Sequence, residues 1–503
     1  MNKCTGPNSI PIFILKIMKP FCSFWLSKII NLSIEKSIFP DLLKMAKITP
    51  LHKKDSKLNH LNYRPISLLS ALSKIFEKVL YVRMYNFITN NNLFYGRQYG
   101  FRHKHSTNHA LISLTENIKS HLDKKNIVCG IFIDLEKAFD TVNHAILSDK
   151  LYQYGFRGDF NSLMKSYLFN RKQFVSINGF DSKIKTITCG VPQGSSLGPL
   201  LFLIYINDFR HCLINSYSGH FADDTYIMYA NKNIKSIETV INYELKLAIK
   251  WMNLNKLSLN VDKTNLILFH SKYKKLDLKK FSIKLNGKKL LPVDFVKYLG
   301  MYIDKHLSWD YHISQLAKKL SRSNGILSKL RYNTPINVRI QVYYAIFYSY
   351  LNYGGAMWGL TFEANLNIIR ILQKKCLRII TFSDFNSHTN QLFLDHEILK
   401  LDEIIKLNQL KLIYDYKNNL LPGDIQSLFN LERNIHSYET SGISKDLLYI
   451  PSIQSSNYGN KSLKFQGPYL WNKTVKAYPN LNDVNSSYRF KHFIKSIFLT
   501  SYK

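Results

Sequence analysis

The stretch His220-Phe221-Ala222-Asp223-Asp224-Thr225-Tyr226-Ile227-Met228-Tyr229 places two adjacent carboxylates between two short apolar runs. Residues 216–221 and 225–229 are rich in aromatic and β-branched side chains, which favours strands. The short link between them predicts a hairpin with Asp223 and Asp224 at its tip. Burying two neighbouring charges is costly without a cation, and carboxylate oxygens suit Mg²⁺ or Mn²⁺. Asp is also common in polar turns, so this stretch alone leaves both interpretations open.

The composition indicates a folded protein with a polyanionic partner. Hydrophobic residues make up 46% of the 503 residues, enough for a substantial core and about two to four domains. The net charge is +35, from 69 Lys and Arg against 34 Asp and Glu, which favours nucleic acid as a partner. A basic surface without a specific partner, or a membrane-surface protein, is the alternative. The 32 Tyr and 31 Phe supply rings on which bases can stack.

The cysteines and the N-terminal apolar run exclude two further classes. The six cysteines stand at 4, 22, 129, 189, 212 and 376, and no two have C-x2-C spacing, so we expect neither zinc nor a disulfide framework. This usage fits a reducing, intracellular compartment. Residues 10–33 are apolar but are interrupted by Lys16, Lys19, Pro20 and Lys28, short of the ~18 residues that a spanning helix needs. We therefore expect no membrane partner.

Basic residues gather after the first strand expected in the chain. Residues 46–51 predict that strand, and Lys53 and Lys54 follow it; Arg64 lies in the segment Asn62-Tyr63-Arg64-Pro65-Ile66-Ser67. Cations near the ends of a hairpin could bind a triphosphate from both sides, because Arg offers a planar fork and Lys a compact charge. The alternative is ordinary solvated surface charge. Further along, Ser106 and Thr107 can cap a helix that runs to about residue 122.

A third carboxylate ends another predicted strand. Residues 128–134 are mostly apolar and finish at Asp134, and a helix over 142–154 should stop at Gly155. Asp134 could be a metal ligand or a strand-end cap. A hairpin is predicted from 174–177 and 183–188 around Asn178-Gly179. The glycine-rich segment 190–199 leads into a buried helix over 197–210 and lacks the P-loop pattern.

The second half becomes progressively helical. A long helix with one apolar face is predicted around 237–252, and 295–303 is the last strand candidate. Lys263 is either a solvated turn lysine or an acid near a leaving group. Residues 311–331, 335–352, 365–381 and 393–419 read as helices, so we place a domain boundary near 305.

The three carboxylates, Asp134, Asp223 and Asp224, could form one metal-binding site. If the two strands are neighbours, Asp134 can face Asp223, and two such charges ~4 Å apart repel by roughly 4 kcal/mol at an effective dielectric of 20. Two divalent ions would convert that repulsion into a site for in-line phosphoryl transfer. Lys53 or Lys54, together with Arg64, would neutralise the remaining phosphate charge.

The chain also carries a series of short motifs in a fixed order. They are His52-Lys53-Lys54, Asn62-Tyr63-Arg64-Pro65-Ile66-Ser67-Leu68, Gln98-Tyr99-Gly100-Phe101-Arg102, His105-Ser106-Thr107, Asp134-Leu135-Glu136-Lys137-Ala138-Phe139-Asp140-Thr141-Val142, Gly190-Val191-Pro192-Gln193-Gly194-Ser195-Ser196-Leu197-Gly198-Pro199, Phe221-Ala222-Asp223-Asp224, Leu259-Asn260 with Lys263-Thr264, and Tyr298-Leu299-Gly300. This ordered set closely resembles the reverse transcriptases of non-LTR (LINE-type) retrotransposons of the jockey-like group. The resemblance runs from about residue 5 past 380, and Phe465-Gln466-Gly467-Pro468 with Trp471-Asn472 resembles the family's C-terminal tail.

The resemblance implies an α+β right-hand polymerase fold: fingers, a palm with an antiparallel sheet, a helical thumb and a mostly helical C-terminal extension. We expect an N-terminal helical extension at 1–45, fingers and palm at 46–305, the thumb at 306–390 and the C-terminal extension at 391–503. The implied activity is RNA-directed DNA polymerase, a nucleotidyltransferase that uses two Mg²⁺ or Mn²⁺ ions, an RNA template, a DNA primer and dNTPs in retrotransposition.

The resemblance also assigns roles to residues. Asp134, Asp223 and Asp224 would hold the metals with the Leu135 carbonyl as a further ligand, and Lys263 would protonate the pyrophosphate. The dNTP would contact Lys53, Lys54, Arg64, Leu135, Phe139, Gln193 and Gly194, with Phe139 as the aromatic gate that excludes a 2′-hydroxyl. Tyr298, Leu299 and Gly300 would form the primer grip.

The chain departs from the family pattern at its start. Intact elements of this group carry an endonuclease ahead of the polymerase and often a zinc module, so we expect a 5′-truncated copy or a partial gene model. Nuclear action would follow from the family's priming on chromosomal DNA. Two other functions remain: an RNA-dependent RNA polymerase, which Gly-Asp-Asp would have favoured over Phe-Ala-Asp-Asp, and a catalytically silent retrotransposon remnant that at most binds nucleic acid.

Overall fold

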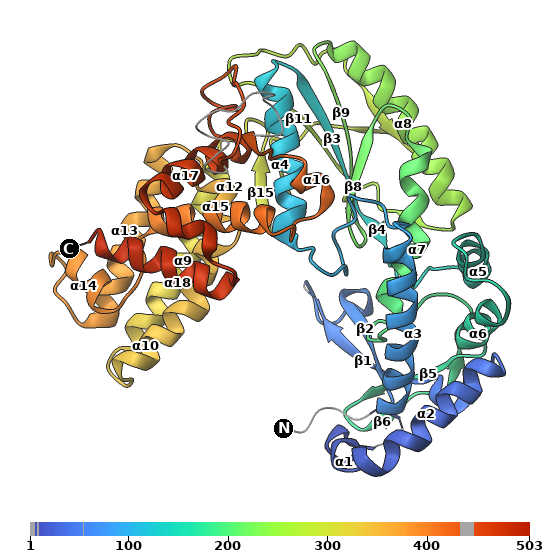
Figure 1. Ribbon diagram of the computed structural model, residues 1–503. Helices are drawn as coiled ribbons and strands as arrows, with labels where there is room; N and C mark the ends of the chain where they lie inside the picture. The colour runs from blue at the N-terminus through green and yellow to red at the C-terminus, as the bar shows by residue number, and fades with distance from the viewer. Residues whose placement is uncertain (1–5, 8–9, 54, 433–446, 503) are drawn as a thin grey trace. The chain divides into compact units, whose positions relative to one another are not determined.

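The computed structural model describes residues 6, 7, 10–53, 55–432 and 447–502, so the predicted site residue Lys54 lies outside the described residues. The chain forms two compact units (Figure 1). The first unit comprises the chain up to Phe101 together with Ile133–Thr225 and Asn242–Thr264. The second comprises Arg102–Phe132, Tyr226–Ile241 and residues from Asn265 onward.

Helices surround the sheets of the first unit. They are α1 (Ile12–Ile17), α2 (Lys19–Glu35), α3 (Ala71–Asn90), α5 (His144–Gln153), α6 (Gly158–Leu168) and α7 (Gly198–Ile206). The predicted buried helix is confirmed, because all but one residue of α7 is buried. Gly155 follows α5 with a φ of 97°, as predicted for a residue that ends a helix in the left-handed region.

The first sheet of this unit combines antiparallel and parallel pairs. Strand β1 (Met45–His52) pairs antiparallel with β2 (Tyr63–Leu69) and parallel with β5 (Lys172–Ile177). Asn178 and Gly179, with φ of 50° and 88°, turn β5 directly into β6 (Phe180–Asp181), while β7 (Lys185–Thr186) also pairs with β5. The predicted return strand at 183–188 is therefore wrong in extent, since a two-residue turn needs its partner at 180.

The strands that carry the carboxylates belong to another sheet, with order β11-β3-β9-β8, and β11 and most of β3 and β9 fall in the second unit. They are β11 (Asn265–Phe269), β3 (Ile127–Ile133), β9 (Asp224–Asn231) and β8 (Tyr217–Phe221). Every residue of β3 is buried, as its apolar sequence predicts, and β3 pairs antiparallel with β11. The two-residue strand β4 (Leu135–Glu136) pairs with β10 (Ser258–Leu259), and α8 (Ile234–Leu254) is the predicted long helix.

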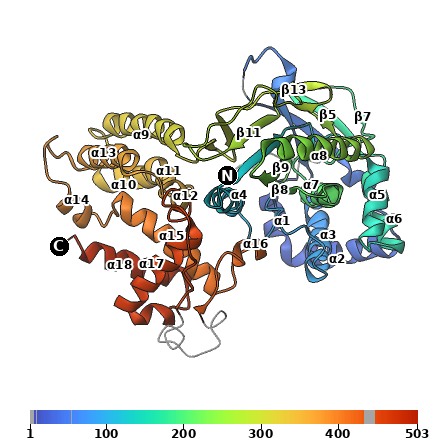
Figure 2. The same ribbon diagram turned by 90° about the horizontal axis from the view of Figure 1, so that it is seen from above.

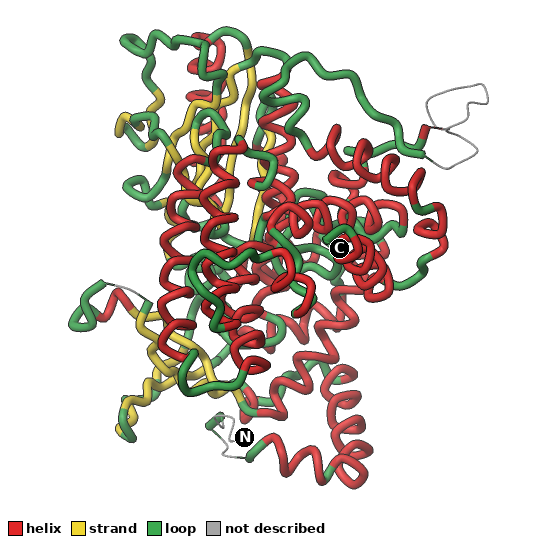
Figure 3. The backbone as a smooth tube through the Cα atoms, turned by 90° about the vertical axis from the view of Figure 1, so that its left-hand side faces the viewer, coloured by secondary structure: helices red, strands yellow, loops and turns green. Residues whose placement is uncertain are grey.

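The second unit is mainly helical (Figures 2 and 3). Its helices are α4 (Thr107–Asp123), α9 (Asp310–Leu330), α10 (Ile336–Tyr343), α11 (Ser349–Asn352), α12 (Gly355–Trp358), α13 (Glu363–Thr381), α14 (Asn390–Asp395), α15 (Leu401–Lys417), α16 (Gly423–Gln426), α17 (Leu463–Ala477) and α18 (Ser487–Thr500). The predicted cap of α4 is confirmed, because Ser106 Oγ accepts the His109 N–H. Helices α17 and α18 agree with a mostly helical C-terminal extension.

Three predictions for this unit need correction. The single helix expected at 393–419 is broken between α14 and α15, where Glu397 takes a φ of 49°. The helix at 335–352 contains a π-helical turn at Tyr344–Tyr348. The single strand at 295–303 is a hairpin of β14 (Phe295–Tyr298) and β15 (Met301–Asp304), because Leu299 and Gly300 both take positive φ, the requirement of a tight hairpin turn.

A short hairpin of β12 (Ile283–Leu285) and β13 (Lys288–Leu290) completes the strands of the second unit. No helix within the described ranges has the length and apolar character needed to cross a bilayer.

Candidate active site

Asp134 lies directly after β3 in the first unit, with its side chain partly exposed. The backbone N–H of Asn260 donates a hydrogen bond of 2.9 Å to the Asp134 carbonyl. The Lys263 ammonium lies 3.9 Å from the Asp134 carboxylate, and both side chains are substantially exposed. The next residue, Leu135, pairs with Leu259. The turn at 260–264 and the β4–β10 pair thus fix the backbone on both sides of the Asp134 carboxylate.

The Asp223-Asp224 turn is tighter than the sequence predicts. Strand β8 ends at Phe221 and β9 begins at Asp224 itself, so Ala222 and Asp223 alone form the link. Ala222 takes a φ of 57°, which is unfavourable for a residue with a Cβ. Such a conformation persists where the surroundings impose it.

The segment around Gln98 imposes that conformation. The Gln98 Oε1 atom accepts the N–H of Ala222 at 3.1 Å and that of Gly100 at 3.0 Å. The N–H of Tyr99 donates to the His220 carbonyl at 2.9 Å. A Cβ atom at Gly100 would lie 2.4 Å from the Ala222 nitrogen, so only glycine permits this close approach. Buried Gln98 and Gly100 therefore position the carboxylate turn.

His220 supports the turn from the inside. Its Nδ1 atom lies 2.9 Å from the Thr225 hydroxyl, and its Nε2 atom lies 3.0 Å from the Ser218 hydroxyl. Burial lowers the pKa of His220 to about 3, so the ring is neutral at physiological pH. The ring thereby joins β8 to the first residues of β9 without adding charge beside the carboxylates.

The carboxylates influence one another. Burial, followed by the charge of Asp134, raises the pKa of Asp223, while Lys53 and Arg64 lower it. Burial and then the charges of Asp223 and Asp134 raise the pKa of Asp224 to about 6, although part of its side chain reaches solvent. The structure thus brings Asp134, Asp223 and Asp224 within electrostatic range of one another. Lys53 and Arg64 lie close enough to act on Asp223.

The glycine-rich loop contacts the β1–β2 hairpin that carries Arg64. The Ser67 N–H donates to the Gln193 carbonyl at 2.8 Å. Gly194 takes a φ of 127°, and a Cβ atom there would lie 2.5 Å from the Ser67 carbonyl oxygen. The Gln193 amide donates to Asp140 at 2.9 Å, which lowers a pKa that burial raises. Gln193 therefore connects the loop after Asp134 to the strand that holds Arg64.

Phe139 is half-buried on the same loop. Its ring stacks on Phe202 of α7 with centroids 4.5 Å apart and meets the edge of Phe101 at 6.2 Å. The Phe139 carbonyl accepts the Val191 N–H at 2.8 Å. These contacts hold the ring on a rigid support, as a steric gate requires.

A buried carboxylate, Glu77, supports the start of α7 next to the glycine-rich loop. Glu77 of α3 accepts the Ser196 N–H at 2.7 Å and the Tyr167 hydroxyl at 2.9 Å. Both Glu77 and Arg171 are fully buried. Burial raises the pKa of Glu77, and the charge of Arg171 opposes that rise. The N-terminal end of α7 is thus fixed to the interior of the unit.

The structure collects ten predicted site residues in the first unit and leaves three in the second. The ten are Lys53, Arg64, Asp134, Leu135, Phe139, Gln193, Gly194, Asp223, Asp224 and Lys263. Tyr298, Leu299 and Gly300 form the β14–β15 turn, where the Tyr353 hydroxyl donates to the Leu299 carbonyl. Sequence reasoning did not assign roles to Gln98, Gly100, His220 or Glu77. Gln98 and Gly100 stood in a quoted motif and His220 in the opening stretch, whereas Glu77 stood in neither.

Metal binding can be tested against the donor set. Among the described residues, no three His, Cys, Asp or Glu side chains converge closely enough to hold an ion in their present positions. The Asp134 carboxylate instead lies beside Lys263. The donor chemistry nevertheless fits a hard divalent cation, since the three side chains supply carboxylate oxygens, and the charge of Asp134 acts on both Asp223 and Asp224. Side-chain rotation would be needed to bring them together.

A carboxylate pair in a strand turn, an Asp at the end of a neighbouring strand and a glycine-rich loop are the elements that the sequence predicts for a polymerase palm. The chain belongs to the reverse transcriptase (RNA-dependent DNA polymerase) family, whose model matches residues 51–303. The predicted resemblance and the α+β fold class with antiparallel sheets are thereby confirmed.

Two of the similar relatives come from Drosophila melanogaster. The RNA-directed DNA polymerase from mobile element jockey is 26% identical over 437 residues, covering 84% of this chain and 47% of that protein. The probable RNA-directed DNA polymerase from transposon BS is 29% identical over 396 residues, covering 76% of this chain and 43% of that protein. The chain spans about half the length of the curated relatives it matches. Among solved structures, apo telomerase from Candida tropicalis matches with a TM-score of 0.40 and 12% identity, over 78% of this chain and 67% of that chain.

Proposed function

We propose that this protein is an RNA-directed DNA polymerase of a jockey-like non-LTR retrotransposon. It transfers nucleotides from dNTPs to a primer 3′-hydroxyl, and it acts in the nucleus, where such elements prime on chromosomal DNA. The observation that carries the proposal is the collection of Asp134, Asp223 and Asp224 opposite Lys53 and Arg64 in one unit.

Asp134, Asp223 and Asp224, with the Leu135 carbonyl, are the groups that would hold two Mg²⁺ or Mn²⁺ ions. When bound, the ions would polarise the primer hydroxyl and neutralise the leaving pyrophosphate. The raised pKa of Asp224 supports this assignment, because burial and the charges of Asp223 and Asp134 disfavour an uncompensated negative charge there, and a bound cation would compensate it.

The remaining residues orient the substrate. Lys53, Lys54 and Arg64 supply positive charge for the triphosphate, and Gln193 and Gly194 line the nucleotide. The side chain of Lys263 is 61% exposed, so it can turn from Asp134 toward the pyrophosphate and donate a proton there. The Phe139 ring excludes a 2′-hydroxyl, and the Tyr298-Leu299-Gly300 turn grips the primer.

Primer extension tests the proposal. With poly(rA)/oligo(dT), Mg²⁺ and dTTP, the protein should extend the primer and Asp223→Ala should not. Asp181→Ala, which removes an exposed carboxylate from strand β6, should retain activity. If the wild type and Asp223→Ala are equally inactive while both bind the duplex, the chain is a silent remnant. If rNTPs are incorporated as readily as dNTPs, the assignment to a DNA polymerase fails.

A further inference from the structure

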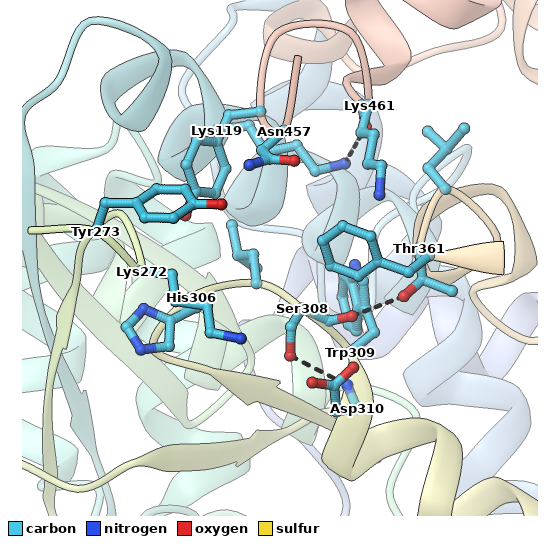
Figure 4. A pocket seen from close by; sticks show the side chains of 14 residues that line it. Lys119, Lys272, Tyr273, His306, Ser308, Trp309, Asp310, Thr361, Asn457 and Lys461 are labelled. Atoms are coloured by element: carbon cyan, nitrogen blue, oxygen red, sulfur yellow. Dashed lines mark hydrogen bonds between the residues drawn. The ribbon is translucent and has the colours of Figure 1, made fainter. Parts of the chain in front are cut away.

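A cationic cavity lies wholly within the second unit, and none of its lining residues belongs to the carboxylate site. It has a volume of about 320 Å³, at the small end of the range for ligand pockets. Five segments line it: α4, the loop after β11, the start of α9, the link from α12 to α13, and the loop before α17. Figure 4 shows their side chains pointing toward a common space.

The cavity is built by specific contacts. Asp123 at the end of α4 accepts the Ser455 hydroxyl at 2.7 Å and the Gln454 N–H at 3.2 Å. Buried Lys119, paired with Glu116, donates to the Lys461 carbonyl at 2.7 Å. These bonds fix the loop before α17 onto α4, so the wall that contains Asn457 and Lys461 is rigidly placed.

Positive charge in the cavity exceeds the negative charge that faces it. Lys119, Lys272 and Lys461 line it, with Asp310 as the acidic lining residue. Glu116 is already engaged by Lys119 and by the Lys464 N–H. Burial and the charge of Lys119 lower the pKa of Lys461, and Asp310 only partly opposes this. An anion in the cavity would relieve the repulsion between the lysines.

Aromatic rings accompany these cations at the mouth. Phe362 is 46% exposed and Tyr273 is 84% exposed, so both offer ring surface to a ligand. The Lys461 ammonium lies 3.3 Å from the Phe362 ring centroid. A cation beside an exposed ring suits a ligand that combines a phosphate with a planar base. The exposed amide of Asn457 can bond to a base edge.

Two further lysines, Lys274 and Lys275, directly follow the lining residues Lys272 and Tyr273 in the chain. Additional cations outside a one-nucleotide cavity favour a chain of phosphates over a single one. We propose that this cavity holds one nucleotide of a single-stranded nucleic acid, with its phosphate at Lys272 and Lys461 and its base on Phe362 or Tyr273. The identity of the ligand rests on the proposed function, whereas the cavity itself does not.

The proposal can be tested with binding and cross-linking. Fluorescence anisotropy would measure the affinity of a labelled 12-nucleotide RNA over a range of salt concentrations. Lys461→Gln and Phe362→Ala should each weaken binding about 5-fold or more, the typical loss of a stacked base. Lys461→Gln should also reduce the log–log salt slope by about 0.7, the loss of one phosphate contact. The matched controls Lys375→Gln and Phe385→Ala, on exposed residues elsewhere in the unit, should bind as the wild type does.

A further variant guards against misfolding of Lys461→Gln, and cross-linking shows where the RNA binds. Lys272→Gln replaces an exposed lysine and should also reduce the log–log salt slope. It serves as the test if Lys461→Gln fails to fold. RNA that contains 4-thiouridine should cross-link to peptides with Tyr273 or Phe362. Unchanged affinities together with cross-links confined to the first unit would overturn the proposal. AMP that competes as strongly as the 12-nucleotide RNA would overturn the polynucleotide assignment.

The two proposals can fail separately. Cross-links at the cavity in a protein that cannot extend primers would leave this site standing and refute the polymerase. Primer extension without cross-links at the cavity would support the polymerase and refute the nucleotide site in the cavity.

Discussion

Gly100→Ala should misplace the catalytic turn without touching any carboxylate. The new Cβ would lie 2.4 Å from the Ala222 nitrogen, while ordinary van der Waals contact begins at 3.4 Å, so the turn must move by about 1 Å. Displacements of that size can cost about 100-fold in rate when they alter the geometry of reacting groups. Because the clash is with backbone, rotation of a side chain cannot relieve it.

Steady-state primer extension on poly(rA)/oligo(dT) would measure this effect. We expect kcat to fall about 100-fold, with duplex affinity nearly unchanged and unfolding free energy lower by about 1–3 kcal/mol. Gly96→Ala is the matched control, since nothing lies within 4 Å of a Cβ at that position and the residue is only four places away. A Gly100→Ala protein that extends primers at the wild-type rate would refute the argument that Gln98 and Gly100 set the position of Asp223.

Three other perturbations test separate parts of the first unit. Burial holds the pKa of His220 at about 3 against an ordinary 6.5, so the unfolded state takes up more protons and stability falls as pH drops below 6.5. His220→Gln should be less stable than the wild type at pH 7. Between pH 6.5 and pH 5, however, its unfolding free energy, measured by denaturant titration, should fall by about 2 kcal/mol less than that of the wild type. Equal decreases in the two proteins would show that His220 does not titrate as argued. Glu77→Gln removes the buried negative charge that faces buried Arg171 and should lower the unfolding free energy by about 3–5 kcal/mol, whereas an unchanged melting temperature would rule out the Glu77 charge as a support. Phe139→Val should increase incorporation of rNTPs relative to dNTPs in single-nucleotide extension, and an unaltered ratio would exclude Phe139 as the gate.

Local features of the fold follow well from the sequence. The Ser106 cap, the glycine at 155 and the buried helix around 198–206 are where side-chain chemistry places them. Pairings between distant strands do not follow, because nothing in residues 45–48 identifies residues 172–175 as their parallel partner. The break between α14 and α15 at 396–400 also does not follow from the sequence, since the helical spacing of apolar residues continues across it.

The sequence predicts the carboxylates of the candidate site but not the residues that hold them in position. Asp134 and the Asp223-Asp224 pair stand out because carboxylates rarely interrupt apolar strands. Gln98 and Glu77 do not stand out, since their importance lies in backbone N–H groups contributed by residues about 120 positions away. Hydrogen bonds of this kind appear only once the chain is folded.

The close approaches of backbone to backbone around the site also bear on how such a gene would decay. At positions 100, 190 and 194, a methyl group would fall within 2.6 Å of another segment's main chain. Most surface positions can change without consequence, but a single replacement at any of these three would displace backbone segments of the candidate active site. A copy released from selection could therefore be silenced at these positions while all three carboxylates were still intact. The three glycines are thus a sensitive gauge of whether a copy has begun to erode, and in this chain all three are intact.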